Sequence, residues 1–393
     1  MAKVGTVDPA AQEMLEIARE AGIETSFDRA ENVKPCPIGS DGACCKICAM
    51  GPCRLVGKVK TGICGATLDT VVARNLARQI AAGAAAHSDH GRDMAMAMLA
   101  VTEGEAPDYR IRDVRKLVEV AKHLDVPVEG RETNDIAHDV AESALAQFGQ
   151  QRGTLKYLER APKKRQQIWK ELGIEPRGID REVVETLHRT HIGNDQDAEH
   201  ILDHGLRTAL ADGWGGSMLS TDITDILFGT PVPLSSEVNM GALEEDQVNI
   251  IIHGHEPLLS EMILMAVQDP EMVEYAKSKG ATGINLTGIC CTANETLMRQ
   301  GVRTVGNFLS QELAIATGAV EAMVVDIQCI MQALVPVAEQ YHTKLITTSR
   351  KAKITGALHM EFNEHEALKI AKDIVRVGID NFENLSLIHI SEP

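Results

Sequence analysis

The chain has 393 residues, 44% of them hydrophobic and 3% aromatic, and a formal net charge of −17 at pH 7. This length exceeds one typical hydrophobic core, so we expect two or three domains. The acidic charge argues against binding to nucleic acid, and the absence of a run of about 18 apolar residues argues against a membrane-spanning helix.

The amino-terminal segment MAKVGTVDPAAQEML lacks the charged-then-apolar order of a signal peptide. We therefore expect a cytoplasmic, reducing environment, where clustered cysteines are usually metal ligands or reactive thiols. The segment also contains the start of the first predicted element, a short amphipathic helix over residues 8–21.

Six of the nine cysteines lie within residues 36–64, separated by Gly and Pro. Four of them have uneven short spacings that suit a cubane iron–sulfur cluster held by four thiolates: Cys45, Cys48, Cys53 and Cys64. Cys36 and Cys44 are left as a pair, which could complete a cluster with the same pair of a second chain. A zinc ribbon or disulfides are the alternatives for this segment.

From residue 66 to about residue 206 the pattern is helical. Gly and Pro divide it into predicted helices at 66–86, 91–103, 112–124, 133–149, 154–172 and 180–191. His87 and His90 follow the Ala-rich first segment with Asp89 and Asp93 nearby, so these histidines could share a face and pass protons. The alternative is a solvated helix end.

Beyond residue 235, short apolar runs alternate with helix-like segments. The runs are 248–253, 283–289, 322–327 and 344–349. This alternation predicts a parallel, doubly wound sheet.

Metal-ligand side chains follow three of these predicted strands. They are His253 and His255 after the first run, Cys290 and Cys291 after the second, and Cys329 after the third. Sites in open α/β sheets form at the carboxyl edge, so these residues predict a metal site there. Taken singly, a buried cysteine is often only a small hydrophobic residue.

Six motifs make the chain resemble the catalytic subunit of anaerobic nickel-containing carbon monoxide dehydrogenase. They are CPIGSDGACCKICAMGPCR, AHSDH, DGWGGSM, HGHEPLLSE, GINLTGICCT and VDIQCIM, and they extend from residue 36 to residue 331. The resemblance therefore covers nearly the whole chain.

The resemblance implies three metal centres. A [4Fe-4S] relay cluster would be held by Cys45, Cys48, Cys53 and Cys64, and a cluster shared across a homodimer by Cys36 and Cys44 of each chain. An active-site nickel–iron–sulfur cluster would take His255, Cys291 and Cys329.

The resemblance also implies catalytic side chains. His87 would be the acid–base residue, His90 would continue a proton path, and Asp212 would lie beside the hydroxide of the cluster. Asp93 stands where a further family histidine is expected.

The implied reaction is the reversible conversion of CO and H2O to CO2, two protons and two electrons. The implied electron acceptor is of the ferredoxin type, and an acetyl-CoA synthase subunit is a possible partner. The alternatives are a hybrid-cluster protein acting on hydroxylamine or nitric oxide, a non-catalytic iron–sulfur electron-transfer subunit, and a structural zinc-binding protein.

The chain departs from the family pattern after Cys329, because no further cysteine follows it. The family takes three more cysteines and a lysine from a C-terminal α/β domain, which we expect to be missing here. The last residues, LSLIHISEP (385–393), read as a spurious tail. We therefore expect the chain by itself to lack CO oxidation activity.

These inferences combine into an α + α/β fold class, in which an N-terminal helical domain with a cysteine loop precedes a Rossmann-like doubly wound α/β domain. The expected boundaries are 1–65 for the first helix and the cluster loop, 66–235 for the helical domain and 236–384 for the α/β domain.

Overall fold

A computed structural model describes residues 5–384, so the expectation for residues 385–393 lies outside the described part. The chain divides into two compact units. One contains residues up to 33, residues 106–108 and residues from 230 onward, and the other contains residues 34–105 and 109–229. No helix in the described residues is both long enough and apolar enough to cross a bilayer.

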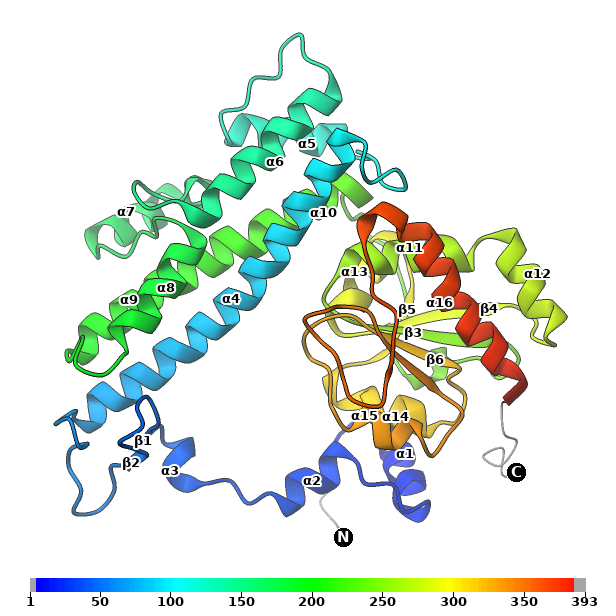
Figure 1. Cartoon of the computed structure of the whole chain (residues 1–393), viewed down its shortest axis with the longest axis horizontal. Coiled ribbons are helices and arrows are strands. Elements are labelled where there is room, and N and C mark those ends of the chain that lie inside the picture. The colour runs from blue at the N-terminus through cyan, green and yellow to red at the C-terminus, as the bar shows by residue number, and fades with distance from the viewer. Residues whose placement is uncertain (1–4, 385–393) are drawn as a thin grey trace. The chain divides into compact units, whose positions relative to one another are not determined.

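The helical unit is built along the long helix α4 (Figure 1). Helices α6, α8, α9 and α10 all pack against α4. The bounds of the unit's elements are α3 (Pro37–Ser40), β1 (Cys44–Cys45), β2 (Cys53–Arg54), α4 (Leu68–Glu103), α5 (Val114–His123), α6 (Thr133–Gly149), η1 (Lys156–Arg160), α7 (Lys163–Glu171), α8 (Ile179–Arg189), α9 (Ala198–Ala211), η2 (Asp212–Ser217) and α10 (Met218–Phe228).

Helix α4 corrects the prediction of two helices at 66–86 and 91–103. It is one helix that begins after the cap Thr67 and ends at Gly104, whose φ of 80° is left-handed. Gly91 does not break it. A Cβ atom at Gly91 would lie 2.9 Å from the carbonyl oxygen of Gly216, so this glycine permits close packing instead. His87 and His90 consequently lie inside a helix and not at a solvated helix end.

Other helix predictions had mixed outcomes. The helix predicted at 133–149 is confirmed by α6, and those at 112–124 and 180–191 correspond to α5 and α8 within two residues. The segment 154–172 is divided at Pro162 into η1 and α7, since proline is unfavourable inside a helix. Helices α9 and α10 were not among the predicted segments.

The α/β unit contains a six-stranded parallel sheet with the order β5-β4-β3-β6-β7-β8. The bounds of the unit's elements are α1 (Pro9–Glu20), α2 (Ser26–Asn32), η3 (Met240–Ala242), β3 (Val248–Gly254), α11 (Pro257–Val267), α12 (Pro270–Ser278), β4 (Ile284–Ile289), α13 (Cys290–Gln300), β5 (Arg303–Gly306), η4 (Phe308–Ser310), α14 (Gln311–Ala316), β6 (Ala322–Val325), α15 (Leu334–Ala338), β7 (Lys344–Thr347), β8 (Leu358–His359), η5 (Glu364–Glu366), α16 (Ala367–Asn381) and η6 (Phe382–Asn384).

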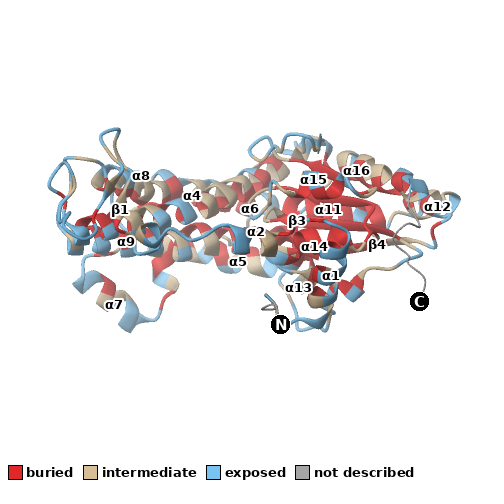
Figure 2. Cartoon of the chain, turned by 90° about the horizontal axis from the view of Figure 1, so that it is seen from below, coloured by how far each residue is buried: buried red, intermediate tan, exposed pale blue. Residues whose placement is uncertain are grey.

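Helices cover both faces of this sheet (Figure 1). Helices α11, α13 and α16 pack on one face, and α14, α15 and α1 pack on the other. Strand β3 is buried along its whole length, as Figure 2 shows, because a strand covered on both faces carries a continuous apolar run. The structure thus confirms the predicted combination of a helical part and a parallel sheet, and the four predicted strands correspond to β3, β4, β6 and β7.

The strand order has a reversal point between β3 and β6. From β3 the chain moves outward to β4 and β5, and it then returns to place β6 on the other side of β3. Open α/β sheets bind ligands at the carboxyl ends of the strands beside such a point. His255 follows β3 and Cys329 follows β6, so both lie in the segments that flank the reversal.

Candidate metal centres

The cysteine loop forms a pocket in the helical unit. Strands β1 and β2 are antiparallel and place Cys45 opposite Cys53. The residues that line the pocket are Cys45, Ile47, Cys48, Cys53, Gly62, Ile63, Cys64, Ala66, Val71, Arg74 and Ile192. The four thiols with cubane spacing therefore share one mostly apolar lining, whereas Cys36 and Cys44 are not part of it.

These thiols fit an iron–sulfur group better than the alternatives. All nine cysteines are free, so disulfides are excluded for this structure. In the described residues no three His, Cys, Asp or Glu side chains converge closely enough to hold a single metal ion. A zinc ion needs four ligands about 2.3 Å from one centre, whereas a cubane distributes its four thiolates over several iron atoms.

The Cys64 thiol is the one whose environment favours the thiolate most clearly. The backbone amide of Ala66 and the guanidinium of Arg74 hold the pKa of Cys64 below its usual value, because both stabilise negative charge on the sulfur. Since the thiolate is the form that ligates metal, this environment fits a ligand role.

Cys36 and Cys44 belong to the same loop but do not line this pocket. Cys36 is exposed and Cys44 is half-buried. The Cys44 carbonyl accepts a hydrogen bond from the Asn75 side chain over 3.1 Å, which ties this part of the loop to α4. The exposed face of α4 beside it carries Leu68, Val72 and Leu76, which repeat every four residues.

The α/β unit brings the second group of thiols together. Burial raises the pKa of Cys290 to about 12, and the neighbouring sulfurs of Cys329 and Cys291 add to the effect. The pKa of Cys291 is raised as well, first by burial and then by Cys329. The thiols of Cys290 and Cys291 both lose water contact and both lie near the Cys329 sulfur, so a nearby cation would favour their ionised forms, and the set fits a metal group.

The backbone at these thiols is unusual. Cys290, Gln328 and Cys329 have φ angles of 63°, 64° and 57°, which place non-glycine residues in the left-handed region. Such conformations cost free energy and tend to occur at functional sites. Here they turn the chain sharply at the ends of β4 and β6, where Cys291 and Cys329 are presented.

A buried carboxyl group connects the three ligand-bearing segments. Asp326 Oδ1 accepts the backbone N–H of His255 over 2.6 Å and also that of Ile327, and Oδ2 accepts the Thr292 hydroxyl over 2.9 Å. A Cβ atom at Gly254 would lie 1.8 Å from Oδ1, so only glycine fits there. Burial raises the pKa of Asp326 to about 7.

The Cys329 turn has two further supports. His253 is fully buried, and its Nε2 lies 3.1 Å from the Cys329 carbonyl oxygen. Gln311 is also buried, donates to that oxygen over 2.9 Å and accepts from the Met331 amide over 3.1 Å. His253 thus faces the backbone of this turn, whereas His255 belongs to the segment that Asp326 holds.

In the helical unit, His87 is part of a polar triad. Its Nδ1 lies 2.7 Å from Asp212 Oδ1 and 3.1 Å from Ser217 Oγ, and the Ser217 hydroxyl also donates to Asp212 over 3.2 Å. Asp212–Ser217 forms a turn of π-helix, a rare element that is frequent at functional sites. His90 is half-buried and follows His87 on the same helix.

Sequence reasoning missed several of these groups. It did not identify Asp326, Gln311 or Ser217, because each acts through contacts between segments that are distant in the sequence. An aspartate that ends an otherwise buried strand was the one available signal for Asp326. It also did not bring Asp212 to His87, which lies 125 residues away.

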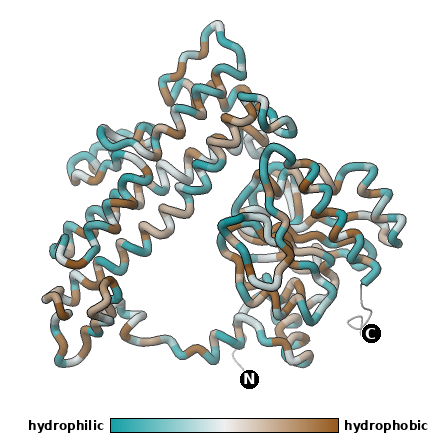
Figure 3. The backbone as a smooth tube through the Cα atoms, in the orientation of Figure 1, coloured by the Kyte–Doolittle hydropathy of each residue, from teal (hydrophilic) through white to brown (hydrophobic). Residues whose placement is uncertain are grey.

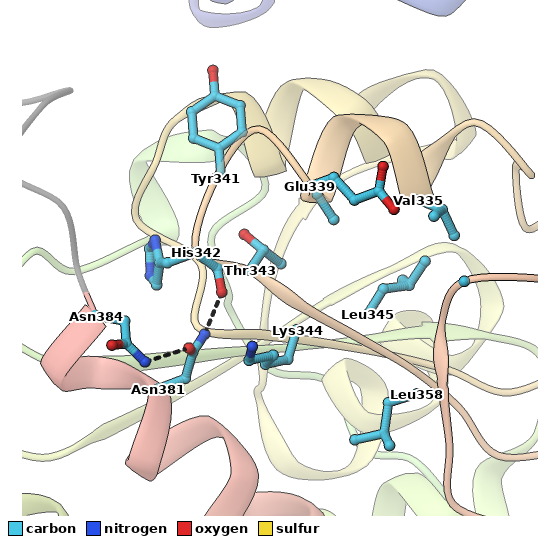
Figure 4. A pocket seen from close by; sticks show the side chains of 12 residues that line it. Val335, Glu339, Tyr341, His342, Thr343, Lys344, Leu345, Leu358, Asn381 and Asn384 are labelled. Atoms are coloured by element: carbon cyan, nitrogen blue, oxygen red, sulfur yellow. Dashed lines mark hydrogen bonds between the residues drawn. The ribbon is translucent and has the colours of Figure 1, made fainter.

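Another pocket lies at the opposite edge of the sheet, where β7 begins (Figure 4). The Asn381 side chain donates to the His342 carbonyl over 2.6 Å, and Asn384 donates to Asn381 over 3.2 Å. This pocket contains no cysteine. Because sites in such sheets form at the carboxyl edge, we do not include it in the candidate site.

Comparisons with known proteins agree with this description. A family profile described as "Prismane/CO dehydrogenase family" matches residues 43–390. Carbon monoxide dehydrogenase 1 of Methanosarcina mazei is 56% identical over 392 residues, 99% of this chain and 62% of that protein. Carbon monoxide dehydrogenase 1 of Carboxydothermus hydrogenoformans is 48% identical over 96% of this chain and 60% of that protein.

Solved structures give the same result. The fold matches a nickel-free crystal structure of the carbon monoxide dehydrogenase from Thermococcus sp. AM4 with a TM-score of 0.95 and 49% identity. The match covers 99% of this chain and 64% of that chain. The chain thus spans less than two thirds of the relatives described here.

Proposed function

The chain belongs to the Prismane/CO dehydrogenase family, and we propose that it is part of an anaerobic carbon monoxide dehydrogenase. The reaction is the reversible conversion of CO and H2O to CO2, two protons and two electrons. One observation carries the proposal. The segments of His255, Cys291 and Cys329 meet around Asp326 beside the point where the strand order reverses. The names of the relatives agree with this reading.

We assign His255, Cys291 and Cys329 as this chain's ligands to a nickel–iron–sulfur cluster. When bound, that group supplies soft, sulfur-ligated metal for CO and water, and takes up the two electrons. The family resemblance implies that further ligands come from a region outside this chain. What this chain contributes is rigidity, because Asp326 and Gln311 fix the turns that carry the ligands.

We assign proton transfer to His87. With Nδ1 donating to the Asp212 carboxylate, proton exchange falls to the other ring nitrogen, Nε2, and the carboxylate stabilises the imidazolium that forms. Ser217 contacts both groups and holds their geometry. His90, one turn later on α4, would carry the proton onward.

We propose that electrons leave through a [4Fe-4S] cluster on Cys45, Cys48, Cys53 and Cys64. A second cluster would be shared by Cys36 and Cys44 of two chains, so the proposal includes a homodimer. The apolar stripe Leu68, Val72 and Leu76 beside these thiols supports such an interface. The acceptor would be a ferredoxin-type protein.

The remaining expectations are also proposals. They are a Rossmann-like α/β domain, the boundaries at residues 65 and 235, and a cytoplasmic location. Association with an acetyl-CoA synthase subunit is included among them, because a relative in Moorella thermoacetica is named as a subunit of carbon monoxide dehydrogenase/acetyl-CoA synthase. The names of the relatives favour CO dehydrogenase over a hybrid-cluster protein.

The proposal is tested by completing the chain. The chain is fused to the region of the Thermococcus relative that it does not cover, expressed anaerobically with nickel, and assayed for CO-dependent reduction of methyl viologen. We expect activity under CO and none under N2, with a loss of at least about 100-fold in His87→Gln, the lower end of the range for general acid–base catalysis.

Two further variants assign the ligands. His255→Ala removes the ligand proposed directly after β3, whereas His188→Ala removes an exposed histidine of α8 and is expected to leave the activity unchanged. A fusion that holds iron, sulfide and nickel at the level of the intact relative, but does not oxidise CO, would show the proposed function to be wrong.

A further inference from the structure

Arg74 is a buried cation in the second turn of α4. Its side chain is 1% exposed, and it is among the largest fully buried side chains in the described residues. A guanidinium keeps its charge under all physiological conditions. Burial of such a charge is costly unless a negative partner compensates it.

The described residues provide no carboxylate partner for Arg74. Its Nη2 donates to two neutral acceptors, the Asp195 carbonyl over 3.2 Å and the Gln196 side-chain oxygen over 3.1 Å. Its Nε is buried and has no hydrogen-bond partner within residues 5–384. The charge is therefore anchored on one side by neutral groups and lacks a compensating anion.

The other side of Arg74 faces the thiols. Arg74 lines the same pocket as Cys45, Cys48, Cys53 and Cys64. Together with the Ala66 amide, which has the larger effect, it lowers the pKa of Cys64. A cluster ligated by these four thiolates would therefore supply the negative charge that compensates Arg74.

We propose that Arg74 is the residue that sets the reduction potential of the [4Fe-4S] cluster in this pocket, through its buried positive charge. The inference rests on the cluster proposed above. Reduction adds one electron to a group that is already anionic, and a fixed, buried cation beside it stabilises the reduced form more than the oxidised form. Removal of the charge should therefore make the potential more negative.

Arg74 also has a structural contact that the experiment must separate from its charge. Gln196 belongs to the segment between α8 and α9, in which Ile192 lines the same pocket. The Gln196 carbonyl accepts a hydrogen bond from the Thr70 hydroxyl over 3.0 Å. Loss of the Arg74–Gln196 bond could loosen this segment without any electrostatic effect.

The experiment is a redox titration of the reconstituted cluster. The full chain carries Cys36→Ser and Cys44→Ser, so that the signal comes from the four-thiol pocket, and is loaded anaerobically with iron and sulfide. The midpoint potential is followed by the electron paramagnetic resonance signal of the reduced cluster. The variants are Arg74→Gln, which removes the charge, Arg74→Lys, which keeps it, and Gln196→Ala, which removes only the structural contact.

We expect Arg74→Gln to retain iron and sulfide and to shift the midpoint potential to a more negative value. Arg74→Lys should shift it less, and Gln196→Ala should stay near the parent chain. If Arg74→Gln and the parent chain have the same midpoint potential, the inference is wrong. It is also wrong if Arg74→Gln and Arg74→Lys shift the potential equally. If Arg74→Gln fails to hold the cluster, Arg74→Met, which also removes the charge, takes its place in the same comparison with Arg74→Lys and the parent chain.

The iron and sulfide content of the parent chain tests the proposed cluster itself. If the parent chain does not take up four iron and four sulfide per pocket, the cluster assignment fails, and the inference fails with it. A parent chain that holds the cluster, with variants of unchanged potential, overturns only the role of Arg74.

Discussion

Asp326 shows how a single buried carboxyl group can organise a site whose ligands come from three strands. Two of its acceptor bonds go to backbone amides and one to the Thr292 hydroxyl. Each of these donors is at or beside a segment that carries a proposed ligand. Thr292 is buried and the two amides belong to half-buried residues, so removal of the carboxyl group would leave these donors without their acceptor in a site with little access to water.

This leads to a graded stability prediction. Asp326→Ala should lower the free energy of unfolding by roughly 3 kcal/mol, because one buried and two partly buried donors lose their acceptor. Thr292→Val removes one of the three bonds and should cost about 1 kcal/mol. Urea titrations followed by circular dichroism measure both values, and Asp326→Asn, which keeps one oxygen acceptor, should fall between them.

The same variants separate stability from assembly. In the fusion protein we expect Asp326→Ala to lose nickel, while Thr292→Val keeps most of it. Equal nickel contents in the alanine variant and the parent protein would contradict the role of Asp326 in fixing the ligand segments.

At the level of secondary structure, α4 contributes side chains to two different sites along its length. Near its start it carries Arg74 at the thiol pocket, and at its middle it carries His87 against the π-helical turn. A Cβ atom at Gly216 would lie 3.1 Å from the His87 carbonyl carbon and oxygen. The π-turn therefore rests directly on the α4 backbone, and this contact sets the distance between His87 and Asp212.

Two glycines of α4 make a matched pair that tests this contact. A Cβ atom at Gly91 would lie 2.9 Å from the Gly216 oxygen and 3.3 Å from the Phe148 ring, whereas one at Gly83 would meet nothing within 4 Å. Gly83→Ala should stabilise the chain by about 0.5–1 kcal/mol, because alanine is the better helix former. Gly91→Ala should destabilise it by about 1–3 kcal/mol, since the backbone must move.

Urea titration of the two variants gives the comparison directly. In the fusion protein, Gly91→Ala should also reduce CO oxidation, because the displaced turn moves Asp212 away from His87. If both alanine variants stabilise the chain, the close packing of α4 on the π-turn is not significant for stability.

At the scale of the whole molecule, the sequence predicted what depends on local pattern. Long apolar runs predicted the inner strands β3, β4, β6 and β7, and the parallel order then brought His255 and Cys329 to one edge. The edge strand β8 has only two residues, and the edge strand β5 reads RTVG, with a single large apolar residue, so neither gives an apolar run. The continuity of α4 was missed because the sequence alone does not distinguish a glycine that permits close packing, such as Gly91, from a glycine that ends a helix.

Contacts between distant segments could not be predicted in this way. The distance from Arg74 to Cys64 depends on how the cysteine loop folds back on α4, and the pairing of Asp212 with His87 depends on the π-turn. Both involve side chains that are unremarkable in the sequence. A periodic pattern identifies a helix face, but it does not identify which loop covers that face.

An exposed apolar stripe on α4 is suited to the association of two chains. The α4 stripe of Leu68, Val72 and Leu76 is between 37% and 46% exposed, and a Cβ atom at Gly42 would lie 3.5 Å from Val72, so the loop that carries Cys44 rests beside it. Figure 3 shows further hydrophobic residues in this cysteine loop. Apolar surface of this kind, beside the loop that carries the exposed Cys36 and the half-buried Cys44, is expected at an interface between two copies.

We therefore expect Val72→Asp with Leu76→Asp to convert a dimer to a monomer in analytical ultracentrifugation, because two buried charges would oppose association. The control is Leu172→Asp, which changes a leucine of similar type that is 59% exposed elsewhere in the helical unit. The monomeric variant should also lose the iron held by Cys36 and Cys44 while it keeps four iron atoms in the pocket of Cys45. A variant that stays dimeric, or a monomer with undiminished iron, would show that the two chains do not meet at this stripe.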